Sequence, residues 1–449
     1  MLRGLAARHP ERYPVLLDSA AEGPLGRFTV LMAEPAGALW CDAHGRLGAA
    51  GVPAEASAAG GGFLDVLERW WLTERSPRAS EPGPAFNGWA VYLGYEMARE
   101  IEPRLALPAA GFPWQALALR IPCTVVHDRV TGKTQVVAER HAAAALDRIE
   151  ADIRALGLDR GAVAAPLEIL EIEEEPPEAY LERVRRAKAY IAAGDIYQTN
   201  LSRPWRARLD REGVGELYER LCAANPAPFA ALAQWRGSAI LSSSPERLIR
   251  LEEGRIDTRP IAGTRPRSRR EGEDEREMAA LFAHPKERAE HIMLIDLERN
   301  DLGRVCEAGT VRVDELMSIE SYAHVHHIVS NVSGRLRRGL TPIDALRAVF
   351  PGGTITGCPK VRCMQIIAEL EGEGRGPYTG SLGWLGHDGN LDFNILIRTL
   401  AVSGASLELR AGAGIVADSD PERELEETRA KARGLLAALD PRRCGRSAP

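Results

Sequence analysis

The stretch FAALAQWRGSAILSSSPERLIRLEEGRIDTRP, residues 229–260, indicates the fold class. Two apolar runs flank a turn at Arg236 and Gly237, and two more runs flank a turn at Glu253 and Gly254. Short apolar runs around two-residue turns predict antiparallel hairpins. Because helical patterns interrupt such strands elsewhere in the chain, we predict a mixed α and β sandwich rather than a doubly wound parallel sheet.

A change of composition near residue 175 predicts where the chain divides. The acidic run 171–175 is followed by two prolines, and residues 179–193 then place apolar side chains at helical spacing. A length of 449 residues exceeds the usual size of one domain. We therefore expect an N-terminal region, 1–175, and a catalytic region, 178–440.

The composition excludes several broad classes of protein. Apolar residues make up 45% of the chain and charged residues 27%, which is the balance of a globular protein. The net charge of -6 is mild, and no basic stripe indicates nucleic-acid binding. The chain has no apolar run near the ~18 residues that span a bilayer. The start lacks the apolar core of a signal peptide, and the seven cysteines form no disulfide or zinc pattern. We expect a cytoplasmic protein that binds no membrane.

Two pairs of carboxylates are spaced to lie on one face of a helix. Glu287 and Glu290 are three residues apart, as are Glu424 and Glu427, and Lys431 follows one turn later. Such oxygen ligands suit Mg²⁺, which bridges a few carboxylates to an anionic substrate. A solvated helix face with ion pairs between neighbouring turns explains the same spacing. The spacing alone leaves both interpretations open.

The segment SYAHVHHIVSNVSG, residues 321–334, alternates like a strand. His327 shares a face with Val325 and Val329, which predicts a buried histidine that acts as a neutral donor or transfers a proton. His324 and His326 share the other face at a spacing that zinc could use, although no third ligand is evident.

Polar residues and glycines in apolar surroundings are further candidates. Arg398 lies in an apolar run, where an unpaired guanidinium is costly, so we expect it to meet a buried carboxylate or a bound anion. Gly412 and Gly414 complete no dinucleotide fingerprint, but their backbone N–H groups could bind a carboxylate. Single polar candidates are Glu246, Thr264 and Tyr378.

Taken together, nine stretches resemble the chorismate-binding enzyme family, which includes anthranilate synthase component I, aminodeoxychorismate synthase component I, and isochorismate and salicylate synthases. In family order they are GDIYQTNLSR (194–203), SSSPERL (242–248), PIAGTRPR (260–267), ERAEHIMLIDLERNDLGRV (287–305), HHIVSNVSG (326–334), PGGTITGCPKVRCMQIIAELE (351–371), RGPYTGSLGW (375–384), DFNILIRTL (392–400) and AGAGIVADSDPERELEETRAKA (411–432). The resemblance implies an α+β fold like that of anthranilate synthase component I, a large antiparallel β-sandwich with helices packed outside.

The resemblance also implies roles for individual residues. Glu290 and Glu427 correspond to ligands of Mg²⁺, with Glu287 and Glu424 in support. Glu246 corresponds to the general acid that protonates the departing C4 hydroxyl of chorismate, a role that can contribute about 10² to 10⁴-fold to a rate. The other implied catalytic residues are His327, Gln198 and Thr264. The implied substrate-binding residues are Thr354, Tyr378, Arg398, Gly412, Ala413, Gly414 and Lys431.

The residue at position 198 bears on the nucleophile. Family members that add water carry a lysine base where this chain has Gln198, so the resemblance implies that ammonia is the attacking molecule. The chain shows no amidotransferase nucleophile motif. The resemblance therefore implies that a separate glutamine amidotransferase subunit supplies the ammonia.

The motifs are more similar to those of the aminodeoxychorismate branch than to those of the anthranilate branch. They predict formation of 4-amino-4-deoxychorismate, the precursor of 4-aminobenzoate in folate biosynthesis. Ala262 departs from this pattern, because some members of that branch have a lysine there that adds to the substrate, and alanine cannot do so. Anthranilate synthase component I stays open as an alternative. A further alternative is a non-catalytic subunit that binds chorismate, or tryptophan through residues 16–27.

Overall fold

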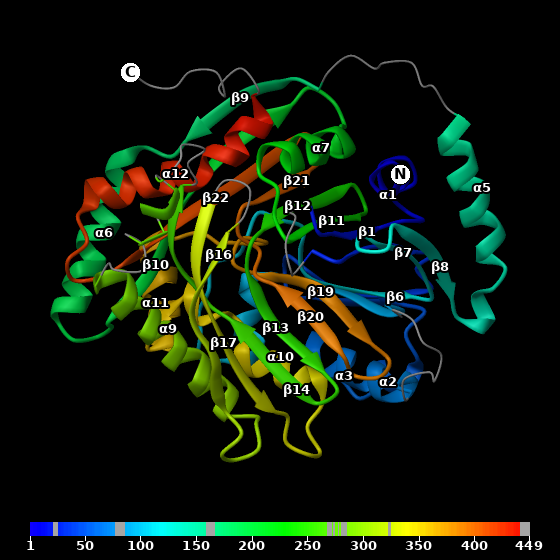
Figure 1. Ribbon diagram of the computed structural model, residues 1–449, viewed down its shortest axis with the longest axis horizontal. Helices are drawn as coiled ribbons and strands as arrows, with labels where there is room; N and C mark the ends of the chain where they lie inside the picture. The colour runs from blue at the N-terminus through cyan, green and yellow to red at the C-terminus, as the bar shows by residue number, and fades with distance from the viewer. Residues whose placement is uncertain are drawn as a thin grey trace.

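The computed structural model describes residues 1–20, 26–76, 86–158, 167–266, 272, 274–276, 278–279, 285–321 and 325–440. Within these ranges, the side chains of residues 158, 262, 264–266, 285–287 and 325 lie outside the description. Two 11-stranded antiparallel sheets form the body of the protein, with helices on their outer faces (Figure 1).

The first sheet contains the strands that carry most of the candidate residues. Its neighbours in order are β18 (Gly357–Cys358), β10 (Gln198–Leu209), β22 (Ser406–Ile415), β21 (Thr399–Ser403), β12 (Ser238–Ser244), β11 (Phe229–Trp235), β1 (Val15–Asp18), β2 (Phe28–Ala33), β7 (Cys123–Asp128) and β8 (Lys133–Ala138), with β9 (Ile169–Glu174) paired to β10.

The second sheet packs against the first. Its order is β15 (Ile261–Pro266), β17 (Val325–Arg335), β14 (Arg255–Arg259), β13 (Arg247–Glu252), β20 (Leu391–Asn394), β19 (Ser381–Gly386), β5 (Gly88–Leu93), β6 (Trp114–Ile121), β3 (Gly37–Asp42) and β4 (Leu47–Ala50), with β16 (Arg312–Ser321) paired to β17. Strands from both sequence regions, 1–175 and 178–440, build each sheet.

Helices and 3₁₀ turns connect and cover these strands. The described helices are α1 (Leu2–Arg8), α2 (Ala54–Ala58), α3 (Phe63–Glu74), α4 (Ala98–Ile101), α5 (Ala145–Leu158), α6 (Pro177–Ala192), α7 (Val214–Ala224), α9 (Pro285–Gly303), α10 (Pro342–Val349), α11 (Lys360–Glu371) and α12 (Pro421–Leu439). The 3₁₀ turns are η1 (Tyr95–Met97), η2 (Arg140–Ala142) and η3 (Gly353–Ile355). In the described part of the chain, no helix combines the length and the apolar character needed to cross a membrane.

Alternation along the strands produces the layers. On β5, Ala90 and Tyr92 face the core between the two sheets, whereas Trp89 and Val91 face a second core that includes residues of α3 and α10. Successive strand residues point to opposite faces, so a strand buried on both faces can be apolar throughout. A third core lies between the first sheet and the helices α1, α7 and α12, which Figure 1 shows along the upper side of the molecule.

The hairpins predicted from residues 229–260 are confirmed. Strands β11 and β12 meet at Arg236 and Gly237, whose φ angles are 46° and 76°, and β13 and β14 meet at Glu253 and Gly254, with φ angles of 50° and 79°. Positive φ at both central residues is the geometry of a tight hairpin turn whose twist matches the strands. The α+β fold class with a large antiparallel β-sandwich is likewise confirmed.

Candidate active site

Two of the candidate residues lie where the chain crosses from one sheet to the other. Glu246 follows β12 of the first sheet and precedes β13 of the second, and Arg398 lies between β20 of the second sheet and β21 of the first. Arg398 has a φ angle of +51°, which is uncommon for a residue with a side chain. Both crossovers therefore place a charged side chain between the sheets, where neither sheet ladder continues.

Glu246 has the properties of a buried acid. Its side chain is only 5% exposed. Burial raises the pKa of Glu246 to about 7, while the Thr354 hydroxyl, the Ile261 amide and the cations of Lys431 and Arg398 partly offset this rise. A carboxylic acid with a pKa near 7 can hold a proton and release it at physiological pH.

His327 is buried, as the strand pattern predicted. Burial, with a contribution from the charge of Arg398, lowers the pKa of His327 to about 3, so the imidazole is neutral. Its Nδ1 lies 3.4 Å from the Gly263 carbonyl oxygen. Since Glu246 and His327 both respond to the charge of Arg398, the two crossovers and β17 contribute to one cluster.

The second half of β22 has an open edge. Strand β21 pairs with β22 only as far as Leu409. On the other side, the amides of Ser202 and Asn200 in β10 donate to the Glu371 carboxylate and the Thr356 carbonyl, not to their partners Gly412 and Gly414. In an antiparallel ladder, the partners of such residues also direct their backbone groups away. The N–H groups of Gly412 and Gly414 therefore point toward the open edge.

A larger residue at Gly412 would collide with the Leu201 carbonyl at 2.6 Å, and one at Gly414 would displace neighbouring side chains. A Cβ atom on Gly412 would lie 2.8 Å from the Tyr378 hydroxyl, and one on Gly414 would lie 2.5 Å from Gln198 Nε2 and 3.3 Å from Glu290 Oε1. Tyr378, Gln198 and Glu290 thus lie directly against β22. The Gln198 amide donates to Glu290 Oε1 over 2.9 Å, which orients that carboxylate.

Lys431 connects the acidic residues with β22. Its ammonium group lies 2.8 Å from Glu427 Oε1 and donates to the Gly412 carbonyl over 3.0 Å. The Lys431 side chain is 45% exposed; its partial desolvation alone would lower its pKa, but the charge of Glu427, with smaller contributions from Tyr378 and Glu290, raises it. Because Lys431 senses both carboxylates, Glu290 of α9 and Glu427 of α12 converge although 137 residues separate them in sequence.

The acidic residues beside β22 carry the donor type that Mg²⁺ prefers. Among the described side chains, no three carboxylate, histidine or cysteine groups come together in the manner of a preformed metal site. Glu290, Glu427 and the buried Glu424 offer hard oxygen donors, and Glu424 and Glu427 both influence Tyr180. Mg²⁺ commonly takes one or two protein carboxylates and completes its shell with water and substrate oxygens. The donor chemistry therefore fits this ion.

Several buried polar atoms near this edge lack a hydrogen-bond partner within the described structure. They are Gln198 Oε1, Asn200 Oδ1, Glu246 Oε1 and Thr354 Oγ1. An unsatisfied buried polar atom costs about 1–3 kcal/mol, so four in one place indicate a site for a polar ligand. Likewise, the guanidinium of Arg398 makes no ion pair or hydrogen bond with any side chain that the structure describes.

Some predicted residues take no visible part in this arrangement. The side chains of Thr264, Glu287 and Ala262 lie outside the described residues. Ala413 packs into an apolar cluster with residues of α6 and α11. His326, considered for zinc, lies 2.7 Å from the Ser321 hydroxyl and 2.9 Å from Asp274.

Two residues of the site were missed by sequence reasoning. Asn200 is an uncharged residue inside a quoted motif, and its position opposite Gly414 was not evident. Glu298 is buried, and burial together with the nearby charge of Asp301 raises its pKa. Its spacing from the buried residues Leu294 and Leu302 on the same helix face could have identified it.

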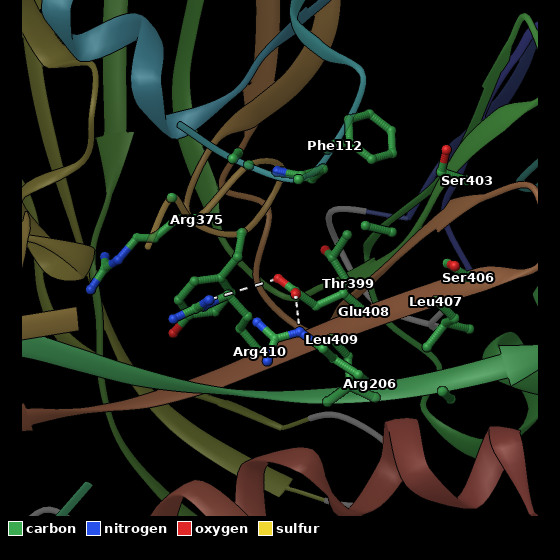
Figure 2. Close-up of a pocket in the computed structure, with 18 of the residues that line it drawn as sticks. Phe112, Arg206, Arg375, Thr399, Ser403, Ser406, Leu407, Glu408, Leu409 and Arg410 are labelled. Carbon is green, nitrogen blue, oxygen red and sulfur yellow. Dashed lines mark hydrogen bonds and ion pairs between the residues drawn. The ribbon is translucent and has the colours of Figure 1, made fainter. Parts of the chain in front are cut away.

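A cleft of about 310 Å³ lies along the first half of β22 (Figure 2). Of the predicted site residues, Tyr378 alone is among the residues that line it. Two of its charged side chains pair with each other, Arg206 with Glu408 at 3.0 Å, and Glu373, which lies outside the lining, contacts Arg206 at 2.6 Å and Arg410 at 2.8 Å. The cleft is thus adjacent to the open edge but has a different electrostatic character.

Comparisons with known proteins agree with this geometry. A family model described as "chorismate binding enzyme" matches residues 42–437. Anthranilate synthase component 1 of Aquifex aeolicus is 43% identical over 81% of this chain and 76% of its own length. Aminodeoxychorismate synthase component 1 of Bacillus subtilis is 39% identical over 82% of this chain and 81% of its own length. The crystal structure of anthranilate synthase component I from Streptococcus pneumoniae has a TM-score of 0.80 at 29% identity, covering 92% of this chain and 93% of that one.

Proposed function

The chain belongs to the chorismate-binding enzyme family, and on this premise we propose that it aminates chorismate to 4-amino-4-deoxychorismate. The observation that best supports amination is the environment of Gln198. Its amide nitrogen is engaged by Glu290, and its buried Oε1 is an open acceptor. A neutral carboxamide cannot deprotonate water, but it can accept a hydrogen bond from ammonia, which is already nucleophilic.

Glu246 would act as the general acid. In the proposed reaction, the lone pair of ammonia forms the new C–N bond, the ring C–O bond breaks, and the hydroxyl leaves as water with the proton of Glu246. The resulting carboxylate then takes the excess proton from the new amine, so the net exchange is ammonia for water. The raised pKa of Glu246, about 7, leaves it protonated in a large share of the molecules at neutral pH.

The cations and backbone amides would hold the two carboxylates of the substrate. Arg398, Lys431, the Tyr378 hydroxyl and the N–H groups of Gly412 and Gly414 face the same edge. Charge-assisted hydrogen bonds to a carboxylate are about twice as strong as neutral ones. Mg²⁺, held by Glu290 and Glu427 with Glu424 nearby, would supply further neutralisation of carboxylate charge. His327 and Thr354 would contact the ring as neutral polar groups.

A test of the product decides the proposal. We expect the enzyme with chorismate, Mg²⁺ and ammonium, followed by a lyase that removes pyruvate, to yield 4-aminobenzoate on chromatography. Product that forms without any ammonia source would instead indicate isochorismate or salicylate synthesis. Chorismate binding without turnover would indicate a non-catalytic subunit.

Formation of anthranilate is the second candidate function. It is favoured by Ala262, which removes the lysine route to the para product, and by the 43% identity to anthranilate synthase component 1 of Aquifex aeolicus. Anthranilate as the sole product of the same incubation would replace the para assignment and leave the amination proposal intact.

The ammonia source would be a glutamine amidotransferase subunit, as in two-component enzymes of this kind. We expect the isolated chain to use ammonium but not glutamine, and to use glutamine once that subunit is added. Glutamine-dependent turnover by the isolated chain would contradict this partner.

The proposed metal ligands can be tested separately from the product. We expect Glu290→Gln and Glu427→Gln to raise the Mg²⁺ concentration needed for half-maximal activity, because each removes a carboxylate charge. Glu426→Gln is a matched control for Glu427→Gln, since Glu426 lies on the same helix, α12, and pairs there with Arg429. An unchanged Mg²⁺ response in both test variants would refute the ligand assignment.

A further inference from the structure

Arg375 is a buried arginine whose hydrogen-bonding capacity is fully used. Its Nε and Nη2 atoms donate to the two carboxylate oxygens of Glu371 over 3.0 and 2.7 Å. Nη2 also donates to the Asn200 carbonyl over 2.7 Å, and Nη1 donates to the Ile355 carbonyl over 3.2 Å and to the Thr379 hydroxyl over 3.3 Å. A guanidinium has five N–H donors, and these five bonds engage all of them.

Apart from Glu371, each acceptor lies beside a residue of the proposed substrate site. Asn200 is the strand partner of Gly414, Ile355 follows Thr354, and Thr379 follows Tyr378. Arg375 itself contacts none of the open polar atoms of the site, and Figure 2 shows its guanidinium pointing away from the adjacent cleft. One planar group therefore connects three chain segments that belong to different elements.

Glu371 keeps this guanidinium in place. It is fully buried, and burial alone would raise its pKa, but the charges of Arg375 and Arg410 lower it, so the carboxylate stays ionised. It also accepts hydrogen bonds from the Ser202 amide at 2.8 Å and the Ser202 hydroxyl at 3.0 Å. Ser202 is the strand partner of Gly412, whose amide points toward the open edge.

Residues of the N-terminal region hold the segment that contains Arg375 and Gly376 from the other side. The buried carboxylate of Glu96 accepts the backbone N–H of Arg375 over 2.7 Å and that of Gly376 over 3.2 Å. The ring of Tyr95 lies 4.8 Å from the Arg375 guanidinium carbon, at cation–π distance. The segment that leads to Tyr378 is thus held both by the Arg375 side chain and by the backbone amides of Arg375 and Gly376.

We propose that Arg375, oriented by Glu371, is a positioning residue that sets Tyr378, Thr354 and the Gly414 strand at the spacing required by chorismate. This inference rests on the proposed function. Lysine would keep the charge but not the role, because an ammonium has three donors and cannot reproduce the planar fork. Tyr378, Thr354 and the Gly414 strand would then lose the group that fixes their relative positions, although they would be chemically unchanged.

A double-mutant cycle tests the positioning role. We expect Arg375→Lys to raise the KM for chorismate about 10-fold or more, with a smaller fall in kcat. Interaction energies between neighbouring residues correspond to changes of roughly 2- to 150-fold in a binding or rate constant. Tyr378→Phe removes the anchor itself. We expect the loss in the double variant to be clearly smaller than the product of the two single losses, because the part of the Arg375→Lys effect that comes from a misplaced Tyr378 hydroxyl is absent when that hydroxyl is removed.

Multiplying effects in the double variant would overturn the proposal, as would wild-type kinetics in an Arg375→Lys enzyme whose only change is a lower Tm. Should Arg375→Lys fail to fold, Thr379→Val decides, because it keeps the shape of the side chain and removes the hydroxyl that accepts from Arg375 Nη1 and donates to the Tyr378 carbonyl over 2.6 Å. We expect a smaller rise in KM that is again reduced in the Tyr378→Phe background. Rises that multiply would overturn the proposal.

Two further measurements separate the possible causes of failure. Arg206→Lys is a matched control, since this arginine pairs with Glu373 and Glu408 in the neighbouring cleft, and we expect its kinetics to equal those of the wild type. Calorimetric binding of chorismate to the wild-type enzyme tests the proposed function directly. If the wild type binds chorismate and the cycle multiplies, the positioning role alone is wrong.

Discussion

The two halves of β22 lie beside buried and partly buried charges in opposite states. Beside the first half, Glu371, Arg375, Arg410 and Glu373 form a paired network in which every charge meets a partner within hydrogen-bond or ion-pair distance. Near the second half, Glu246 and Arg398 form an open pair that interacts only over longer distance, and neighbouring polar atoms lack partners in the described structure. Buried charge is costly unless it is compensated. The paired network therefore stabilises the fold, whereas the open pair awaits a charged ligand.

The largest expected effect is on the acid of the open pair. Glu246→Gln should lower kcat by about 10² to 10⁴-fold, because the amide keeps the shape but cannot protonate the leaving hydroxyl. Chorismate affinity, measured by calorimetry, should stay close to that of the wild type. Unchanged turnover would remove Glu246 from the acid role.

A pair of arginine variants compares the two regions directly. Arg398→Met should reduce kcat/KM by roughly 10- to 150-fold through loss of a charge-assisted hydrogen bond, with no loss of Tm, because no described side chain depends on it. Arg410→Met should lower the free energy of unfolding by about 1–3 kcal/mol, because the buried Glu371 and the partly buried Glu373 each lose one of their two cations. Thermal unfolding and kinetics of both variants are the measurements. The contrast between the halves fails if Arg398→Met destabilises as much as Arg410→Met.

The pH dependence of stability sharpens the comparison further. The folded protein raises the pKa of Glu246 from 4.5 to about 7, so the native state holds this proton more tightly than the unfolded chain does. The resulting stabilisation is complete below about pH 4.5 and is lost as the pH rises through 7, a change of about 3 kcal/mol at most. Relative to the wild type, Glu246→Gln should therefore become more stable at pH 8 than at pH 4.5. Denaturant unfolding at the two pH values measures this difference, and a constant difference would show that the pKa is not raised.

The smallest effect is expected at an exposed ion pair. Arg148 contacts Glu34 at 3.0 Å on the surface and is 53% exposed. Arg148→Ala should change the free energy of unfolding by about 1 kcal/mol or less, because solvent screens such pairs. Activity should not change. A larger loss of stability would mean that pairing alone, without burial, can account for the paired network.

Local sequence signals predicted the hairpins well. Arg236 with Gly237 and Glu253 with Gly254 determine tight turns through their own backbone preferences, and the neighbouring apolar runs supply the strands. The helical pattern around Glu290 and the one around Glu427 were visible in the sequence in the same way. By contrast, Asn200, Glu371 and Arg375 carry no local signal of their roles, since each depends on partners from other elements.

By itself, the sequence determined the fold class, the membership of a family and the chemical types available to the site. Only the tertiary structure decided which charges are compensated and which are open, and where the amides of Gly412 and Gly414 point. The physical reason is range. Turn and helix preferences act over a few residues, whereas desolvation and ion pairing depend on every atom that packs nearby, whatever its distance along the chain.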